Sequence, residues 1–140
     1  MSLVFFTDRD LGLQFPTILE SAGLTVQRHR DHFPHDCPDD VWLEAVGVRG
    51  WVALTHDGRI RYKPNELAAI VTHRVALLVI VGKATNAELA RSFLATLNPV
   101  LSFLNTHPPP IIGTVYRSAT GDIAEGPQRP GHVELWYPRP

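Results

Sequence analysis

Two short apolar segments of this chain each end at an aspartate. Residues 3–7 (Leu-Val-Phe-Phe-Thr) lead into Asp8, and residues 51–56 (Trp-Val-Ala-Leu-Thr-His) lead into Asp57. Short apolar segments rich in Val, Phe and Trp predict buried strands. In an open sheet of parallel strands, ligands bind at the carboxyl ends of the strands. The two aspartates therefore predict a cation site at one edge of a sheet.

Strand and helix patterns alternate along most of the chain. The segment from Val75 to Val81 is uninterrupted by polar residues, as expected for a central parallel strand. The alternation predicts an α/β fold: a doubly wound parallel sheet of about five strands, with helices on both faces in three layers. Strands are expected at residues 3–7, 24–27, 51–55, 75–81 and 111–116. Helices are expected near residues 16–22, 39–48, 64–73 and 86–104, with a kink at Pro99 and a polar loop at 29–38.

The length of 140 residues predicts one domain. We assign residues 1–117 to this domain, because the composition changes to proline and glycine after Arg117. Residues 118–140 are expected to form a Pro/Gly-rich C-terminal tail. The apolar residues 133–137 near its end would fold back on the core or contact another chain.

Composition and charge exclude several classes of protein. The net charge of −1 argues against a protein that coats nucleic acid through bulk charge, but it leaves a nuclease open. A single cysteine excludes an intrachain disulfide. No apolar segment is long enough to cross a bilayer, and the N-terminus lacks the pattern of a signal peptide. We expect a cytoplasmic protein without a membrane partner.

Further carboxylates are expected near the two strand-end aspartates. Asp39 and Asp40 begin a predicted helix on the same side of the sheet, and Asp10 and Glu66 are close in sequence to other members of the set. Converging carboxylates repel each other, and a hard cation such as Mg²⁺ or Mn²⁺ relieves the repulsion. A site of this kind orients and deprotonates a water molecule for in-line attack on a phosphodiester.

A purely structural role explains the same acids. Asp8 and Asp57 would then be turn residues, and Asp39 or Asp40 would cap a helix. Spacing alone leaves both interpretations open.

A second cluster combines His29, His32, His35 and Cys37 within nine residues. Its spacing is too tight for a usual zinc finger, and no second ligand pair follows. We prefer a polar loop whose histidines are exposed or contact substrate phosphate. Cys37 is a weak candidate nucleophile in this proline-rich loop. Glycine-rich phosphate-binding motifs are absent, so nucleotide-dependent chemistry is not expected.

A basic group borders the predicted acidic site. Arg59, Arg61 and Lys63 follow Asp57 directly. Cations at this place would hold the phosphates of an RNA backbone. The alternative is a solvated turn.

The order of these features resembles the PIN-like domains of the VapC toxin group. FFTDRDLG (5–12) is followed by DHFPHDCPDDVWLEAVGVRGWVALTHDGRIR (31–61), then by a strand and a long helix. The resemblance covers about residues 3–117, and its most specific part is the T-x-D pattern at residues 55–57. Each piece alone is weak, but their order and spacing together are fairly specific.

The resemblance implies a Mg²⁺- or Mn²⁺-dependent ribonuclease, a hydrolase with a carboxylate cluster. By position, the catalytic and metal-binding acids are Asp8, Asp39 and Asp57, with Asp40 as the alternative to Asp39. Thr55 would be a supporting hydroxyl at the RNA site.

The chain departs from the family pattern at one position. Many relatives carry a further acid two residues after the T-x-D aspartate, where this chain has Arg59. Asp10 is a candidate replacement, while Arg59 and Arg61 would position the RNA. The resemblance also implies the toxin of a type II toxin–antitoxin pair, with a cognate antitoxin protein as partner and a possible homodimer.

Two other classes of function stay open. One is a receiver-like signalling domain phosphorylated on Asp57, because a strand-end aspartate suits a phosphoacceptor and doubly wound folds host both activities. The receiver pattern has a lysine after the last sheet strand, where this chain has Arg117. The other class is a catalytically degenerate PIN-like binding module.

Overall fold

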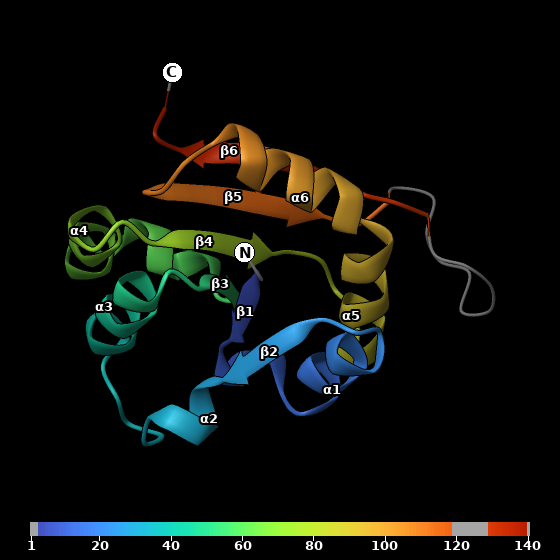
Figure 1. Ribbon diagram of the computed structural model, residues 1–140, viewed down its shortest axis with the longest axis horizontal. Helices are drawn as coiled ribbons and strands as arrows, with labels where there is room; N and C mark the ends of the chain where they lie inside the picture. The colour runs from blue at the N-terminus through green and yellow to red at the C-terminus, as the bar shows by residue number, and fades with distance from the viewer. Residues whose placement is uncertain (1–2, 119–128, 140) are drawn as a thin grey trace.

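A sheet of six strands in the order β2-β1-β3-β4-β5-β6 forms the centre of the computed structural model, which describes residues 3–118 and 129–139 (Figure 1). Its strands are β1 (Val4–Thr7), β2 (Thr25–Arg28), β3 (Val52–Thr55), β4 (Ala76–Ile80), β5 (Ile111–Tyr116) and β6 (His132–Tyr137). The first five are parallel, and β6 pairs antiparallel with β5. The predicted α/β class, with a sheet covered by helices on both faces, is confirmed. The five predicted parallel strands are joined by an antiparallel sixth, β6, which was not predicted.

Helices connect the strands. The α-helices are α1 (Gln14–Ser21), α2 (His29–His32), α3 (Asp39–Arg49), α4 (Pro64–Thr72), α5 (Asn86–Ala95) and α6 (Leu97–Thr106). Two 3₁₀ helices, η1 (Arg9–Leu11) and η2 (Gly58–Tyr62), directly follow β1 and β3 in the chain. None of the helices in the described ranges combines the length and the apolar character needed to cross a membrane.

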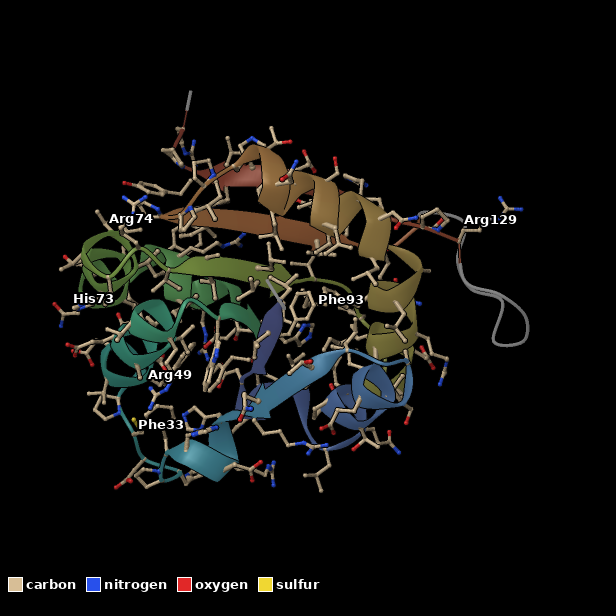
Figure 2. All side chains as sticks on the ribbon, viewed as in Figure 1. Phe33, Arg49, His73, Arg74, Phe93 and Arg129 are labelled. Atoms are coloured by element: carbon tan, nitrogen blue, oxygen red, sulfur yellow. The ribbon has the colours of Figure 1, made fainter. Side chains whose placement is uncertain are left out.

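Two apolar cores lie on opposite faces of the sheet. On one face, Phe93 of α5 points toward the sheet (Figure 2) and contacts Phe5 of β1 edge-on, with 5.5 Å between ring centroids. Helices α1 and α5 lie side by side on this face (Figure 1). On the other face, the fully buried Trp42 of α3 stacks on Phe6 of β1 at 5.3 Å. Alternate residues of β1 thus serve opposite cores, as a strand with two covered faces requires.

The helix predicted at residues 86–104 is two helices, α5 and α6, and the break lies at Thr96 rather than at Pro99. Pro99 lies in the first turn of α6, where a missing N–H group is tolerated. The buried Thr96 hydroxyl donates to the Ser92 carbonyl at 2.8 Å and accepts the Gly131 N–H at 2.9 Å. These bonds stabilise the junction between the two helices.

The polar loop predicted at residues 29–38 is partly helical. His29 begins the short helix α2 and is only 3% exposed, packed against Phe6, Phe33 and Trp42. Its Nδ1 accepts a hydrogen bond from Arg9 Nε at 2.9 Å. A histidine amid charged neighbours is therefore part of the core, which its local sequence does not reveal.

The C-terminal segment contributes a strand to the sheet. Residues 132–137, expected within a tail, form β6 beside β5 and run in the opposite direction (Figure 1). A register shift lies between Ile112 and Gly113, and Trp136 of β6 packs against the core that contains Trp42. The apolar end of the segment thus folds back on the core.

The strand order reverses between β1 and β3. The chain crosses from β1 to β2 on one side and returns to β3 on the other side of β1. Ligands of open α/β sheets bind outside the carboxyl ends of the strands at such a point. Asp8 follows β1 and Asp57 follows β3 at this edge of the sheet.

Truncation after Arg117 tests whether β6 belongs to the folded domain. Its removal should lower the free energy of unfolding in urea by about 2 kcal/mol or more, since the Trp136 contacts are lost. It should also promote aggregation through the exposed edge of β5. Truncation after Tyr137, which keeps β6, is the control. If chain 1–117 were as stable and monomeric as the full chain, residues 118–140 would be a dispensable tail.

Candidate carboxylate site

Asp8 is fixed at the end of β1 by three hydrogen bonds. Its backbone N–H donates to the Leu54 carbonyl of β3 at 3.0 Å. Its Oδ1 accepts the Arg9 N–H at 2.8 Å and so caps η1. Its Oδ2 lies 2.9 Å from the Thr55 hydroxyl oxygen. A half-buried carboxylate is thereby held against the end of β3.

Asp10 brings a second carboxylate to the same hydroxyl. Its Oδ2 lies 3.3 Å from Thr55 Oγ1 and accepts the His56 N–H at 3.1 Å. The Thr55 side chain is fully buried, and a hydroxyl has one hydrogen to donate. Asp8 and Asp10 therefore share one donor, which leaves part of their negative charge without compensation.

Asp57 makes a different set of contacts. Its N–H donates to Thr55 Oγ1 at 3.1 Å, which links it to the shared hydroxyl. Its carboxylate caps η2 through the Arg59 N–H at 3.0 Å. The Arg59 guanidinium binds both carboxylate oxygens, at 2.9 Å and 3.2 Å, while its side chain stays 83% exposed. Arg59, which stands where the family pattern has an acid, therefore neutralises Asp57.

The electrostatics of the three acids follow from these contacts. Burial raises the pKa of Asp8 to about 6, and the charge of Asp10 adds to the shift. The Asp10 side chain is exposed as a whole, but burial of its carboxyl group against the chain raises its pKa. The Arg59 hydrogen bond lowers the pKa of Asp57. The charged forms of Asp8 and Asp10 are thus disfavoured, whereas the charged form of Asp57 is stabilised by Arg59.

Asp39 is close to this pair, but it faces its own helix. It begins α3 and accepts a hydrogen bond from Trp42 Nε1 at 2.9 Å. Its charge is near enough to contribute to the raised pKa of Asp8. Asp40, the alternative to Asp39, lines a separate pocket between α3 and α4 with Glu44. Glu66 lies in the first turn of α4.

The predicted acids therefore converge only in part. Asp8 and Asp10 meet at Thr55, whereas Asp39 and Asp57 each bond to another partner. Among residues 3–118 and 129–139, no three His, Cys, Asp or Glu side chains are grouped closely enough to hold a metal ion. The structure thus offers a pair of carboxylates with two further acids nearby.

The histidine and cysteine cluster does not form a ligand set in the same ranges. His29 is buried and bonded to Arg9, and His32 bonds to Gln27 Oε1 at 2.7 Å. Burial and the charge of Asp39 raise the pKa of the Cys37 thiol. A thiol that stays protonated is a poor nucleophile.

The basic residues are more constrained than their sequence suggests. Arg59 is bound to Asp57, and Arg61 donates to Gly58 O and to Thr114 Oγ1, each at 3.0 Å. Arg61 also lies over the ring of Trp136, 5.2 Å from its centroid. Trp136 was not among the predicted site residues, because its segment was assigned to a tail.

His56 was also missed by sequence reasoning. Its backbone N–H binds Asp10, and its Nδ1 donates to the Ile80 carbonyl at 2.6 Å. The first bond joins the segment after β3 to the segment after β1, and the second joins it to the end of β4. The T-x-D spacing identified the position, but a backbone donor has no side-chain signature.

The raised pKa of Asp8 predicts a pH dependence of stability in the metal-free protein. Between about pH 4 and pH 6 the folded state holds a proton that the unfolded state has released, so stability falls as the pH rises through this range. Asp8→Asn should remove this loss and be more stable than wild type by about 1–3 kcal/mol at pH 7.5.

Urea unfolding in EDTA at pH 4 and pH 7.5 measures the effect, and the two proteins should be nearly equally stable at pH 4. Asp36→Asn, at an exposed acid in the segment before α3, is the control. Equal stability of wild type and Asp8→Asn at both pH values would show that folding does not raise the pKa of Asp8.

Comparison with known proteins identifies the family. A family model described as a PIN-like domain matches residues 3–82, which is more than half of the chain. The match spans β1 to β4 and includes Asp8, Asp10, Asp39 and the T-x-D segment. No curated protein and no solved structure matches the chain. PIN-like domains are commonly nucleases. The carboxylates lie at the carboxyl ends of the strands, where open α/β sheets bind their ligands. The chain belongs to the family of PIN-like domains.

Proposed function

We propose that this protein is a Mg²⁺- or Mn²⁺-dependent endoribonuclease whose site is centred on Asp8 and Asp10. The observation that carries the proposal is the shared Thr55 hydroxyl, which leaves two carboxylates close together with one donor between them. Both carboxyl groups have a raised pKa in the absence of a cation. The membership in a family of nuclease-type folds supports the same conclusion.

The carboxylate oxygens of Asp8 and Asp10 are suitable ligands for a hard divalent cation. Mg²⁺ is usually held by one or two carboxylates, several waters and the phosphate of the substrate. Two converging acids therefore suffice, and a site of three protein ligands is not required. Asp8 and Asp10 would hold the cation. Asp39 and Asp57 would add negative charge beside it. When bound, the cation supplies the positive charge that activates a water molecule for attack on phosphorus.

The protein's own residues prepare this site. Thr55 orients both carboxylates, and the His56 N–H holds Asp10 in place. Arg61, fixed to β5, presents a positive charge to the RNA backbone. During hydrolysis the water oxygen bonds to phosphorus, the bond from phosphorus to the leaving oxygen breaks, and that oxygen takes up a proton.

The biological role that we propose is that of a toxin in a type II toxin–antitoxin pair. The order of FFTDRDLG and the T-x-D segment supports it through the resemblance to the VapC group. A cognate antitoxin protein would bind and block the carboxylate site, and a homodimer would be consistent with this class. Growth arrest upon expression, which requires an intact Asp8, is the corresponding test.

A receiver-like signalling domain is the second candidate. The strand order β2-β1-β3-β4-β5 is also found in that class, with an acid after β1 and an aspartate after β3. Two features weigh against it: Asp57 is neutralised by Arg59, and Arg117 rather than a lysine follows β5. Mass measurement after treatment with a small phosphodonor separates the two, because only a receiver would gain a phosphoryl group.

Replacement of Asp8 or Asp10 by Asn should abolish Mn²⁺-dependent cleavage of RNA, with a loss of at least about 100-fold. The fold should persist, because Asn keeps the oxygen that accepts the Thr55 hydroxyl. Cleavage of labelled RNA and growth of expressing cells are the measurements. Asp57→Asn, which removes an acid from the border of the site, should lower cleavage by less than these two variants.

The matched control for these variants is Glu44→Gln, since Glu44 is an exposed acid on α3 in the separate pocket. It should cleave RNA like wild type. Undiminished cleavage by Asp8→Asn and Asp10→Asn would overturn the assignment. Absence of cleavage by wild type across varied RNAs, with partner binding retained, would favour a degenerate binding module.

Removal of Arg59 should strengthen metal binding. Because its guanidinium occupies both oxygens of Asp57, Arg59→Ala frees this carboxylate for the cation. Titration calorimetry with Mn²⁺ should show a several-fold lower Kd, since an exposed ion pair contributes about 1 kcal/mol or less. Lys63→Ala, which removes a nearby charge without freeing Asp57, is the control. An unchanged Kd in Arg59→Ala would mean that Asp57 takes no part in binding.

A further inference from the structure

We propose that Tyr62, Trp136, Arg61 and Arg139 form an aromatic platform on which unpaired bases of single-stranded RNA stack. The inference rests on the proposed ribonuclease function and specifies the class of its substrate. It assigns a role to β6, which lies outside the range of the family match.

The platform is assembled from two distant parts of the chain. Tyr62, at the end of η2, meets Trp136 of β6 edge-on, with 5.4 Å between centroids and 87° between planes. The Arg61 guanidinium lies 5.2 Å from the Trp136 ring centroid and 5.6 Å from that of Tyr62. Arg139 lies 5.6 Å from the Trp136 ring. Two aromatic rings and two guanidinium groups therefore share one patch of surface.

The patch is anchored on one side and open on the other. Arg61 is fixed by Thr114 and Gly58, and Trp136 packs on the core that contains Trp42. Tyr62, in contrast, is 69% exposed, and Arg139 is exposed as well. Arg61 lies over the Tyr62 ring, so a base would stack on the face of the ring that Arg61 leaves open. The rigid backing means that little conformational freedom is lost on binding.

The register of the sheet connects the platform to the carboxylates. Thr55 of β3 pairs with Val79 of β4, and Val79 pairs with Thr114 of β5. Thr114, which binds Arg61, is therefore level with Thr55, two strands across the sheet. Neighbouring strands are about 4.8 Å apart, so the separation is about 10 Å. Thr55 contacts Asp8 and Asp10, and Thr114 contacts Arg61, so one short RNA strand could reach both the carboxylates and the platform.

Charge complementarity favours a nucleic acid as the occupant. The chain has a net charge of −1, yet residues 58–63 and 136–139 contain no acid and four basic residues: Arg59, Arg61, Lys63 and Arg139. Proteins hold single strands by combining basic side chains with aromatic rings on which bases stack, and this patch offers both. Base faces are accessible only where bases are unpaired, so the platform selects single-stranded over duplex RNA.

Binding of a fluorescein-labelled, eight-nucleotide single-stranded RNA in EDTA tests the platform without cleavage. Tyr62→Ala should raise the Kd about 5- to 150-fold, the range measured for loss of one stacked base. Tyr62→Phe keeps the ring and should bind like wild type. Val48→Ala removes a comparably exposed apolar side chain on α3 and should have no effect. Duplex RNA of the same length should bind more weakly and be insensitive to Tyr62→Ala.

The outcomes separate this inference from the proposed function. If wild type cleaves RNA with Mn²⁺ and Tyr62→Ala binds and cleaves equally well, the platform is overturned and the nuclease stands. If RNA binding depends on Tyr62 but no cleavage occurs, the platform stands and the nuclease is overturned. No binding of single-stranded RNA by wild type, or equal loss in Tyr62→Ala and Tyr62→Phe, would also overturn the platform.

Discussion

The arrangement of the carboxylate site depends on the hydroxyl of Thr55. It lies within hydrogen-bonding distance of Asp8 and Asp10 and accepts the Asp57 N–H, so it joins the segments that follow β1 and β3. These two strands are neighbours because the chain reverses its direction of winding between them. The fully buried Thr55 side chain therefore fixes three acids at the ends of β1 and β3.

This arrangement costs stability. Burial raises the pKa of both Asp8 and Asp10, and the charge of Asp10 adds to the shift at Asp8, so the charged forms of both carboxyl groups are disfavoured. The Arg59 hydrogen bond stabilises the charged form of Asp57, whereas Asp39 accepts a hydrogen bond from the Trp42 indole. The chain thus leaves negative charge uncompensated at Asp8 and Asp10 and compensates it at Asp57. Neighbouring acids with raised pKa values are typical of a binding site rather than of a structural turn.

Much of this could be predicted from the sequence, because it depends on local patterns. The apolar segments before Asp8 and Asp57 predicted the strands, and the strand order then brought the acids together. The role of His29 could not be predicted, because its burial depends on Phe6, Phe33 and Trp42 from other elements. Arg59 was expected near the site, but its direct bond to Asp57 depends on the turn of η2. Strand β6 was missed because proline and glycine dominate its surroundings, whereas its pairing with β5 is a long-range contact.

The register of the sheet has a consequence for how the molecule would measure its substrate. Thr55 and Thr114 are joined through Val79 by backbone pairing across two strands, without an intervening loop. The spacing between Thr55, which contacts the acids, and Thr114, which holds Arg61, is therefore set by the sheet itself. An RNA strand held at both places would be cut within a few nucleotides of the base that stacks on the platform.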